Sequence, residues 1–325
     1  MNMRIGQRSS RARRAAVGLT LAGLSLGLAA CRGGADRNAG AAKTIGVTLL
    51  TREDEFYREL EAGLDTAAAA HGYKLIVTSG DRDLAKQQSQ IDNFIVQGVD
   101  AIIVCPVDSK GIGPAIERAN AKHIPVFTAD IAAQGGDVVS HVASDNVAGG
   151  RLAAEYIAKA IGDKGDVGLI GENDVQSTID RQKGFQDALA AHPNIKLVSS
   201  LDGGGTRDHA LKAADDMLQA HPTISAIFAI NDESALGTLA SAESHHKTKL
   251  VIVGYDADPE AQKAIAGGTE LRADVAQQPG RIGAMTIDAI ADHFAGKAVD
   301  PKIAVPVRIV SADSLKAAAT KAPPG

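Results

Sequence analysis

The fold class is most clearly indicated by residues 100–130, DAIIVCPVDSKGIGPAIERANAKHIPVFTAD. It opens with the apolar run DAIIVCP, continues with a segment of helical period, and closes with a second apolar run, IPVFTAD. Short apolar runs separated by about 12 to 18 residues of helical period are typical of parallel strands joined by crossover helices. The stretch therefore predicts a strand over 100–106, a helix within 109–123 and a strand over 124–130.

The same alternation extends on both sides of this unit. It predicts further strands over 44–50, 73–79, 166–172, 195–201, 225–232 and 249–256. It predicts further helices over 55–72, 83–98, 180–191, 207–220, 233–243 and 259–266. We therefore expect an α/β protein of two similar doubly wound, parallel-sheet lobes. The later strand-like segments ELRADVAQ (270–277) and AVPVRIV (304–310) indicate that the chain crosses between the lobes more than once.

The first thirty residues are not expected to belong to the fold. Residues 1–14 contain five arginines and no acid, and residues 15–30 are apolar, a pattern typical of a secretion signal too short to span a bilayer. The segment LAAC ending at Cys31 resembles the bacterial lipobox, which predicts lipid attachment at Cys31 and a location in the cell envelope on the extracytoplasmic face. The alternative is an ordinary signal peptide that contains a cysteine. Residues 31–42 predict a flexible tether.

The net charge argues against a nucleic-acid partner. The formal net charge is -5, and removal of the five signal arginines would leave -5 - 5 = -10. A chain this acidic, without a basic cluster, is not expected to bind nucleic acid. Cys105 lies in an apolar run and is expected to be a buried small side chain rather than a nucleophile.

Enzyme signatures are missing from the predicted α/β body. Gly203–Gly205 follows a strand without the spacing or lysine of a phosphate loop, and no G-x-S-x-G elbow lies between a predicted strand and a predicted helix. The pair His245 and His246 has no acid at metal-ligand spacing. We expect no catalytic residue, no metal and no cofactor.

Polar side chains stand where four predicted strands end. These residues are Asp130, Asn231, Asp256 and Gln277. Ligands of doubly wound sheets bind at the carboxyl ends of the strands, and carboxylates and amides suit the hydrogen bonds of neighbouring hydroxyl groups. Helix capping is the alternative for any one of them. Four such positions together favour a shared binding site.

Several segments resemble the ribose-binding type of periplasmic sugar-binding proteins. They include TIGVTLLTREDEFYREL (44–60), VVSHVASDNVAGG (138–150), FAINDESALG (228–237) and VIVGYDADPE (251–260). The similarity runs from about residue 44 to residue 310. The resemblance implies a type I periplasmic binding fold that closes on a small sugar or polyol and delivers it to an importer of the ABC class.

The resemblance also implies the site residues. Asp54, with the rings of Phe56 and Tyr57 stacking on the sugar, and Asp130 would come from the first lobe. Arg181, Asn231, Asp256 and Gln277 would come from the second lobe and the crossing.

Three positions depart from the family pattern. Cys105 stands where the family has asparagine, Ile131 where it has arginine, and Gly205 where it has an aromatic ring. The sugar is therefore not expected to be held as ribose is. Asp54, Asp130 and Asp256 against Arg181 leave excess negative charge, which predicts a neutral sugar or polyol, or a cationic amino sugar, rather than an anion.

The expected domain boundaries follow from these segments. The N-terminal lobe is predicted over 43–143 plus 278–305, and the C-terminal lobe over 144–277 plus 306–325, with hinges near 143–144, 277–278 and 305–306. A monomer is expected. A sensory protein that presents a sugar to a membrane receptor remains the alternative function. The ligand-binding domain of a sugar-responsive repressor is disfavoured, because the N-terminus is a predicted signal and not a helix-turn-helix.

Overall fold

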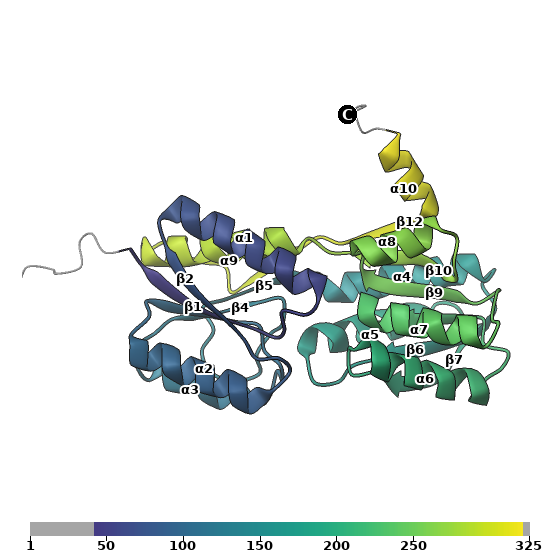
Figure 1. Ribbon diagram of the computed structural model, residues 1–325, viewed down its shortest axis with the longest axis horizontal. Helices are drawn as coiled ribbons and strands as arrows, with labels where there is room; N and C mark the ends of the chain where they lie inside the picture. Colours follow the sequence, from purple (N-terminus) through teal and green to yellow (C-terminus); the bar gives the residue numbers. More distant parts are fainter. Residues whose placement is uncertain (1–41, 321–325) are drawn as a thin grey trace, which may run out of the picture. The chain divides into compact units, whose positions relative to one another are not determined.

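The computed structural model describes residues 42–320. The predicted signal peptide, the lipidation site at Cys31 and nearly all of the predicted tether lie outside the described residues. Two six-stranded sheets form the framework (Figure 1). We call the part of the chain around the first sheet the N-terminal lobe and the part around the second the C-terminal lobe.

The N-terminal lobe is a parallel sheet with helices on both faces. Its strands are β1 (Thr44–Leu49), β2 (Lys74–Ser79), β3 (Ala101–Val104), β4 (Val126–Ala129), β5 (Ser140–Ser144) and β11 (Lys302–Val305), in the order β11-β5-β4-β3-β1-β2. Its helices are α1 (Glu55–His71), α2 (Leu84–Gln97), α3 (Gly113–Asn120) and α9 (Pro279–Phe294). Helices α1 and α9 cover one face, and α2 and α3 cover the other (Figure 1).

The predicted β-α-β unit forms because its strands can be buried on both faces. All four residues of β3 are buried, as are all four of β4, and the two strands pair in parallel with Ile103 opposite Phe127. Helix α3 begins with Pro114 near its N-terminus, a favoured position for proline because no helical N–H is lost there. The unit delivers Asp130 to the carboxyl edge of the sheet.

The C-terminal lobe repeats this plan with one antiparallel edge. Its strands are β6 (Gly165–Gly171), β7 (Ile195–Asp202), β8 (Ala226–Ala229), β9 (Val251–Asp256), β10 (Leu271–Ala276) and β12 (Arg308–Ser311), in the order β12-β10-β9-β8-β6-β7. Its helices are α4 (Asn146–Ala160), α5 (Gln176–Leu189), α6 (Arg207–Ala220), α7 (Asp232–Ser244), α8 (Pro259–Ala266) and α10 (Ala312–Ala319). Helices α4 and α5 pack together against one face of the sheet, and α6, α7 and α8 pack against the other.

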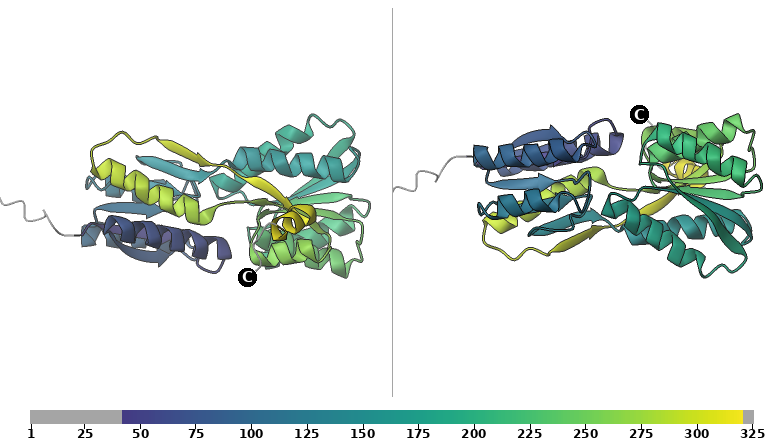
Figure 2. Two further views of the ribbon diagram at one scale, coloured as in Figure 1. Left: turned by 90° about the horizontal axis from the view of Figure 1, so that it is seen from above. Right: turned by 90° about the horizontal axis from the view of Figure 1, so that it is seen from below.

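The chain passes between the sheets three times. It leaves the first sheet after Ser144, returns after Ala276 and leaves again after Val305. The three connections are hydrogen bonded to one another: the Asp145 N–H donates to the Val305 carbonyl at 2.9 Å, and Gln278 Nε2 donates to the Pro306 carbonyl at 2.7 Å. Figure 2 shows the last connection, in yellow, running from one sheet to the other.

The strand-like segment 304–310 divides at the hinge expected near 305–306. The structure places two strands there, β11 in the first sheet and β12 in the second, with β12 antiparallel to β10. The break falls at Pro306, which has no N–H for a sheet ladder. The alternating apolar pattern continues through the proline, so the sequence alone looks like one strand.

Candidate functional site

All eight predicted ligand-binding side chains line one cavity, which we call the inner cavity. Its lining residues are Leu50, Asp54, Phe56, Tyr57, Arg82, Asp130, Ile131, Glu172, Val175, Ser177, Thr178, Arg181, Asn231, Asp256 and Gln277. They come from both lobes, mostly from loops that follow strands and from the first turns of helices. The carboxyl ends of parallel strands meet at one edge of each sheet, which is why residues far apart in the sequence converge here.

Asp130 combines a fixed carboxylate oxygen with a free one. Its backbone φ is 65°, and the residue is 4% exposed. Tyr57 donates its hydroxyl to Asp130 Oδ2 at 2.9 Å, while Oδ1 is buried and has no hydrogen-bond partner among the described residues. Burial raises the pKa of Asp130 to about 6, although the charge of Arg181 and the Tyr57 hydrogen bond act in the opposite direction. The carboxyl group thus has an unused acceptor at the cavity wall.

Tyr57 has a second part in this arrangement. Its ring is buried and meets the Phe56 ring edge to face, with centroids 5.2 Å apart. Burial raises the pKa of the Tyr57 phenol well above its ordinary value, so the hydroxyl stays a donor. The residue therefore orients Asp130 as well as lining the cavity.

Arg181 is fixed on several sides. Its Nε donates to Asn146 Oδ1 at 2.9 Å and its Nη1 donates to the Ile230 carbonyl at 2.7 Å. The guanidinium carbon lies 3.8 Å from the centroid of the Tyr255 ring, a favourable cation–π position. Nη1 also lies 3.9 Å from Asp256 Oδ1. A guanidinium held this firmly offers donors in a fixed direction.

Asp256 and Gln277 are linked at the ends of adjacent strands. Gln277 Nε2 donates to Asp256 Oδ1 at 2.6 Å, and Gln277 Oε1 is buried with no hydrogen-bond partner in residues 42–320. The φ of Asp256 is 120°, and burial raises its pKa well above the ordinary value. Gln277 Oε1, like Asp130 Oδ1, is an acceptor that lacks a donor.

Helix capping occurs at one of the four strand-end residues. Asn231 is the N-cap of α7: its Oδ1 accepts from the Ser234 N–H at 2.9 Å, and its Nδ2 donates to the Gly205 carbonyl at 2.9 Å. Asp256 and Gln277 do not cap, since the N-caps of α8 and α9 are Asp258 and Gln278. Asn231 thus caps α7 and also lines the inner cavity.

Two charged residues that line the inner cavity, Arg82 and Glu172, are not among the site residues predicted from the sequence. Arg82 lies in a polar turn three residues beyond the end of β2, with a φ of 60°, and no periodic signal marks it. Glu172 directly follows β6 and is 8% exposed. The strand-end rule that selects Asp130 and Asp256 also applies to Glu172.

The three departures from the family pattern are all accommodated. Cys105 is fully buried, and burial raises the pKa of its thiol, in keeping with the expected role of a small core residue. Ile131 is buried at the wall of the inner cavity. Gly205 has a φ of 62°, and a Cβ there would lie 2.6 Å from Glu172 Oε2. The Glu172 carboxylate thus takes the space that a side chain at 205 would need.

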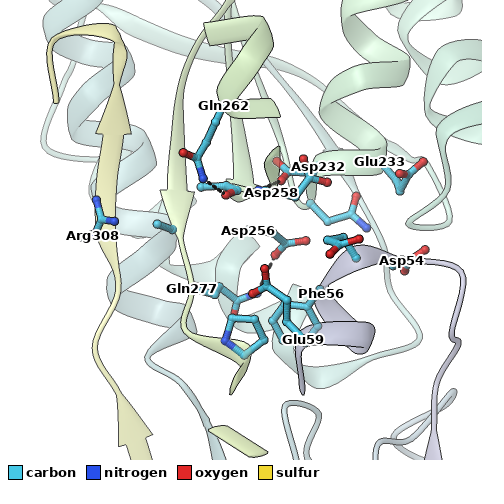
Figure 3. A pocket seen from close by; sticks show the side chains of 15 residues that line it. Asp54, Phe56, Glu59, Asp232, Glu233, Asp256, Asp258, Gln262, Gln277 and Arg308 are labelled. Atoms are coloured by element: carbon cyan, nitrogen blue, oxygen red, sulfur yellow. Dashed lines mark hydrogen bonds between the residues drawn. The ribbon is translucent and has the colours of Figure 1, made fainter. Parts of the chain in front are cut away.

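A second, outer cavity of about 180 Å³ shares five lining residues with the inner one: Asp54, Phe56, Asn231, Asp256 and Gln277. Its charged lining residues are Asp54, Glu55, Glu59, Asp232, Glu233, Asp256, Asp258 and Arg308. Figure 3 shows carboxyl groups from both lobes around this space. Burial raises the pKa of Asp232 and Asp256 well above the ordinary value, but the other five acids still outnumber the single arginine and repel an anionic ligand.

The lobes also touch beside the cavity. The Ser109 N–H donates to the Asp174 carbonyl at 2.9 Å, and the Gln176 N–H donates to Ser109 Oγ at 2.9 Å. Among the described residues, no three His, Cys, Asp or Glu side chains are grouped so as to hold a metal ion. Within residues 42–320, no helix is both long and apolar enough to cross a membrane.

Comparison with known proteins gives consistent matches. The family described as "Periplasmic binding protein domain" matches residues 45–298. The ribose import binding protein of Salmonella typhimurium is 36% identical over 274 residues, which cover 84% of this chain and 92% of that protein. The xylitol-binding protein of Mycolicibacterium smegmatis is 33% identical over 247 residues, 75% of this chain and 70% of that protein.

A solved structure of a myo-inositol binding protein has a similar fold. The myo-inositol binding protein of Caulobacter, bound to myo-inositol, aligns with a TM-score of 0.80 at 29% identity. The alignment covers 86% of this chain and 96% of that one.

Proposed function

We propose that this chain, which belongs to the periplasmic binding protein family and within it to the ribose-binding type, captures a small sugar or polyol between its lobes and delivers it to an ABC importer. Its relatives include proteins named for ribose, xylitol and myo-inositol, which supports a polyhydroxylated ligand.

The observation that carries the proposal is the convergence of eight polar and aromatic side chains on one cavity from both lobes. Asp130 Oδ1 and Gln277 Oε1 lie buried without donors, and a hydroxyl group supplies a donor to each. A buried acceptor left unsatisfied costs free energy that a hydrogen bond from the ligand recovers. Phe56 supplies an apolar surface for the carbon face of a sugar.

The charge of the site supports an uncharged ligand over an anionic one. The outer cavity carries seven acidic residues and one arginine, and the inner cavity adds Asp130 and Glu172 against Arg82 and Arg181. A sugar phosphate entering this space would meet net repulsion.

Closure about the three connections is the proposed mechanism. A ligand that touches both lobes favours the closed arrangement by its differential contacts, as in the hinge-bending binding proteins that illustrate this behaviour generally. We propose the lobe boundaries predicted from the sequence as the moving bodies, with a monomer as the working unit. The importer then reads the closed form. We propose delivery rather than sensory presentation; co-purification with an ABC permease tests this, and capture of a chemoreceptor alone contradicts it.

The proposal extends to the part of the chain outside the described residues. Lipid attachment at Cys31 after removal of residues 1–30 would hold the protein at the extracytoplasmic face of a membrane. Mass spectrometry of the protein from its native membrane is expected to find acylated Cys31 at the mature N-terminus. An unmodified Cys31, or an N-terminus elsewhere, contradicts the anchor.

The experiment that tests ligand binding is a thermal-shift series with ribose, xylitol, D-allose and myo-inositol, followed by calorimetry with the compound that shifts the melting temperature most. Ligand at 100 times its Kd stabilises a protein by about 2.7 kcal/mol, so a true ligand gives a rise of several degrees. Ribose 5-phosphate serves as the anionic control and is expected to give none. Stabilisation by the phosphate alone, or by no neutral compound in an extended set of pentoses, hexoses and alditols, contradicts the proposal.

A further inference from the structure

Arg82 reaches from the N-terminal lobe to the C-terminal lobe. Its Nη2 lies 3.1 Å from Asp54 Oδ2 in its own lobe and donates to the Gly205 carbonyl at 3.2 Å in the other. Its Nη1 lies 3.5 Å from Glu172 Oε1 and from the Gly204 carbonyl. One guanidinium therefore makes contacts in both lobes at the wall of the inner cavity.

Glu172 is the partner of Arg82 in the C-terminal lobe. It is 8% exposed, and its carboxylate occupies the space beside Gly205, where any Cβ would lie 2.6 Å from Oε2. No hydrogen bond is formed by Glu172 Oε2 within the described residues, so this oxygen keeps its capacity to accept one. The C-terminal side of the inner cavity has no aromatic residue among those that line it.

The two charges depend differently on the contact between the lobes. Arg82 keeps Asp54 as a counterion within its own lobe, whereas the closest cation to Glu172 in an ion pair is Arg82 from the opposite lobe. A buried carboxylate is costly unless a cation or hydrogen-bond donors compensate it. Arg181 acts on the charge of Glu172 from within the C-terminal lobe, contact between the lobes adds Arg82, and hydroxyl groups of a ligand add further donors.

We propose that Arg82 and Glu172 form a specificity-determining clasp, which binds adjacent hydroxyl groups of the ligand at this wall and is complete only when the lobes meet. The guanidinium donates to hydroxyl oxygens, and the carboxylate accepts from hydroxyl hydrogens. The clasp rests on the proposed function, because its ligand is the sugar or polyol of the same cavity. It replaces ring stacking on the C-terminal side with polar recognition.

The test is a double-mutant cycle on ligand affinity with Arg82→Gln, Glu172→Gln and the double variant. Calorimetry uses whichever of ribose, xylitol, D-allose and myo-inositol stabilises the wild type most. Each single variant is expected to weaken binding at least about tenfold, because it removes one partner of a partly buried charge pair and leaves the other less well compensated. The fold loss of affinity in the double variant is expected to be smaller than the product of the two single fold losses, because the two residues act together.

Controls separate recognition from folding. Arg118→Gln removes an ion pair with Asp92 made within the N-terminal lobe, at 2.7 Å, and is expected to bind as the wild type does. Arg82→Lys keeps the charge without the forked geometry and is expected to lose affinity while it retains the wild-type melting temperature. It serves as the measured variant should Arg82→Gln fail to fold.

The outcomes are distinct. If the wild type binds one of these compounds and both Arg82→Lys and Glu172→Gln bind it with a Kd within threefold of the wild-type value, the clasp is overturned and the proposed function stands. Losses that multiply fully in the double variant also overturn it, since the two residues then act independently. A wild type that binds none of these compounds, nor the extended set, overturns the proposed function itself.

Discussion

Asp130 and Asp256 hold their backbones in positive-φ conformations, at 65° and 120°. Such conformations cost about 1–3 kcal/mol for a residue other than glycine and persist where the surrounding structure enforces them. Both residues stand at the carboxyl end of a strand and line the inner cavity. The strain is consistent with carboxylates that are aimed at a ligand at some cost to stability.

Asp274 on β10 makes stability depend on pH. It is fully buried beside Asp232, and burial raises its pKa to about 7 from an ordinary value of 3.8, although hydrogen bonds with Asp232 and with backbone N–H groups act in the opposite direction. The folded protein therefore holds this proton more tightly than the unfolded chain does. The stability that results is complete below about pH 4 and is lost as pH rises toward 7, because each tenfold difference in proton affinity between the folded and unfolded states corresponds to about 1.4 kcal/mol.

We expect the melting temperature of the wild type to fall between pH 5 and pH 8, and that of Asp274→Asn to fall less. At pH 8 the variant is expected to be more stable than the wild type by several degrees, because it lacks the Asp274 carboxyl group, which ionises in the core of the wild type. Scanning calorimetry across this pH range checks both statements. Parallel pH profiles for the two proteins would contradict them.

At the scale of elements, helices α1 and α9 pack backbone against backbone. A Cβ on Gly63 would lie 2.1 Å from the Gly280 carbonyl oxygen, and one on Gly283 would lie 2.5 Å from the Leu60 carbonyl oxygen. Gly63→Ala is expected to destabilise the fold by about 1–3 kcal/mol, because the helices must separate. Gly280→Ala on α9 is the matched control, because a Cβ there would lie 3.7 Å from its nearest atom, the Glu59 carbonyl oxygen, and the variant is expected to be neutral. Equal melting temperatures for the two variants would show that the helix contact tolerates a methyl group.

Elements with strong local patterns could be predicted from the sequence. The helices over 207–220 and 259–266 begin and end where their apolar period does, and β3 is a wholly buried apolar run. The alternating pattern of 304–310 does not by itself show two strands, because the partners of β11 and β12 lie far away in the chain; the division falls at the hinge expected near 305–306. Arg82 could not be predicted either, since its place at the cavity depends on the reach of a long side chain from a turn.

At the scale of the whole molecule, the three connections between the sheets form one hydrogen-bonded group. A ligand that bridges the lobes would act on all three at once, because none of them can move without disturbing its neighbour. Ligand binding is expected to bring the lobes together around the inner cavity.

Small-angle X-ray scattering with and without saturating ligand measures whether the lobes close. We expect the radius of gyration to decrease when the stabilising sugar or polyol is added, and to remain constant with ribose 5-phosphate. Identical scattering profiles for the free and fully bound protein would contradict closure.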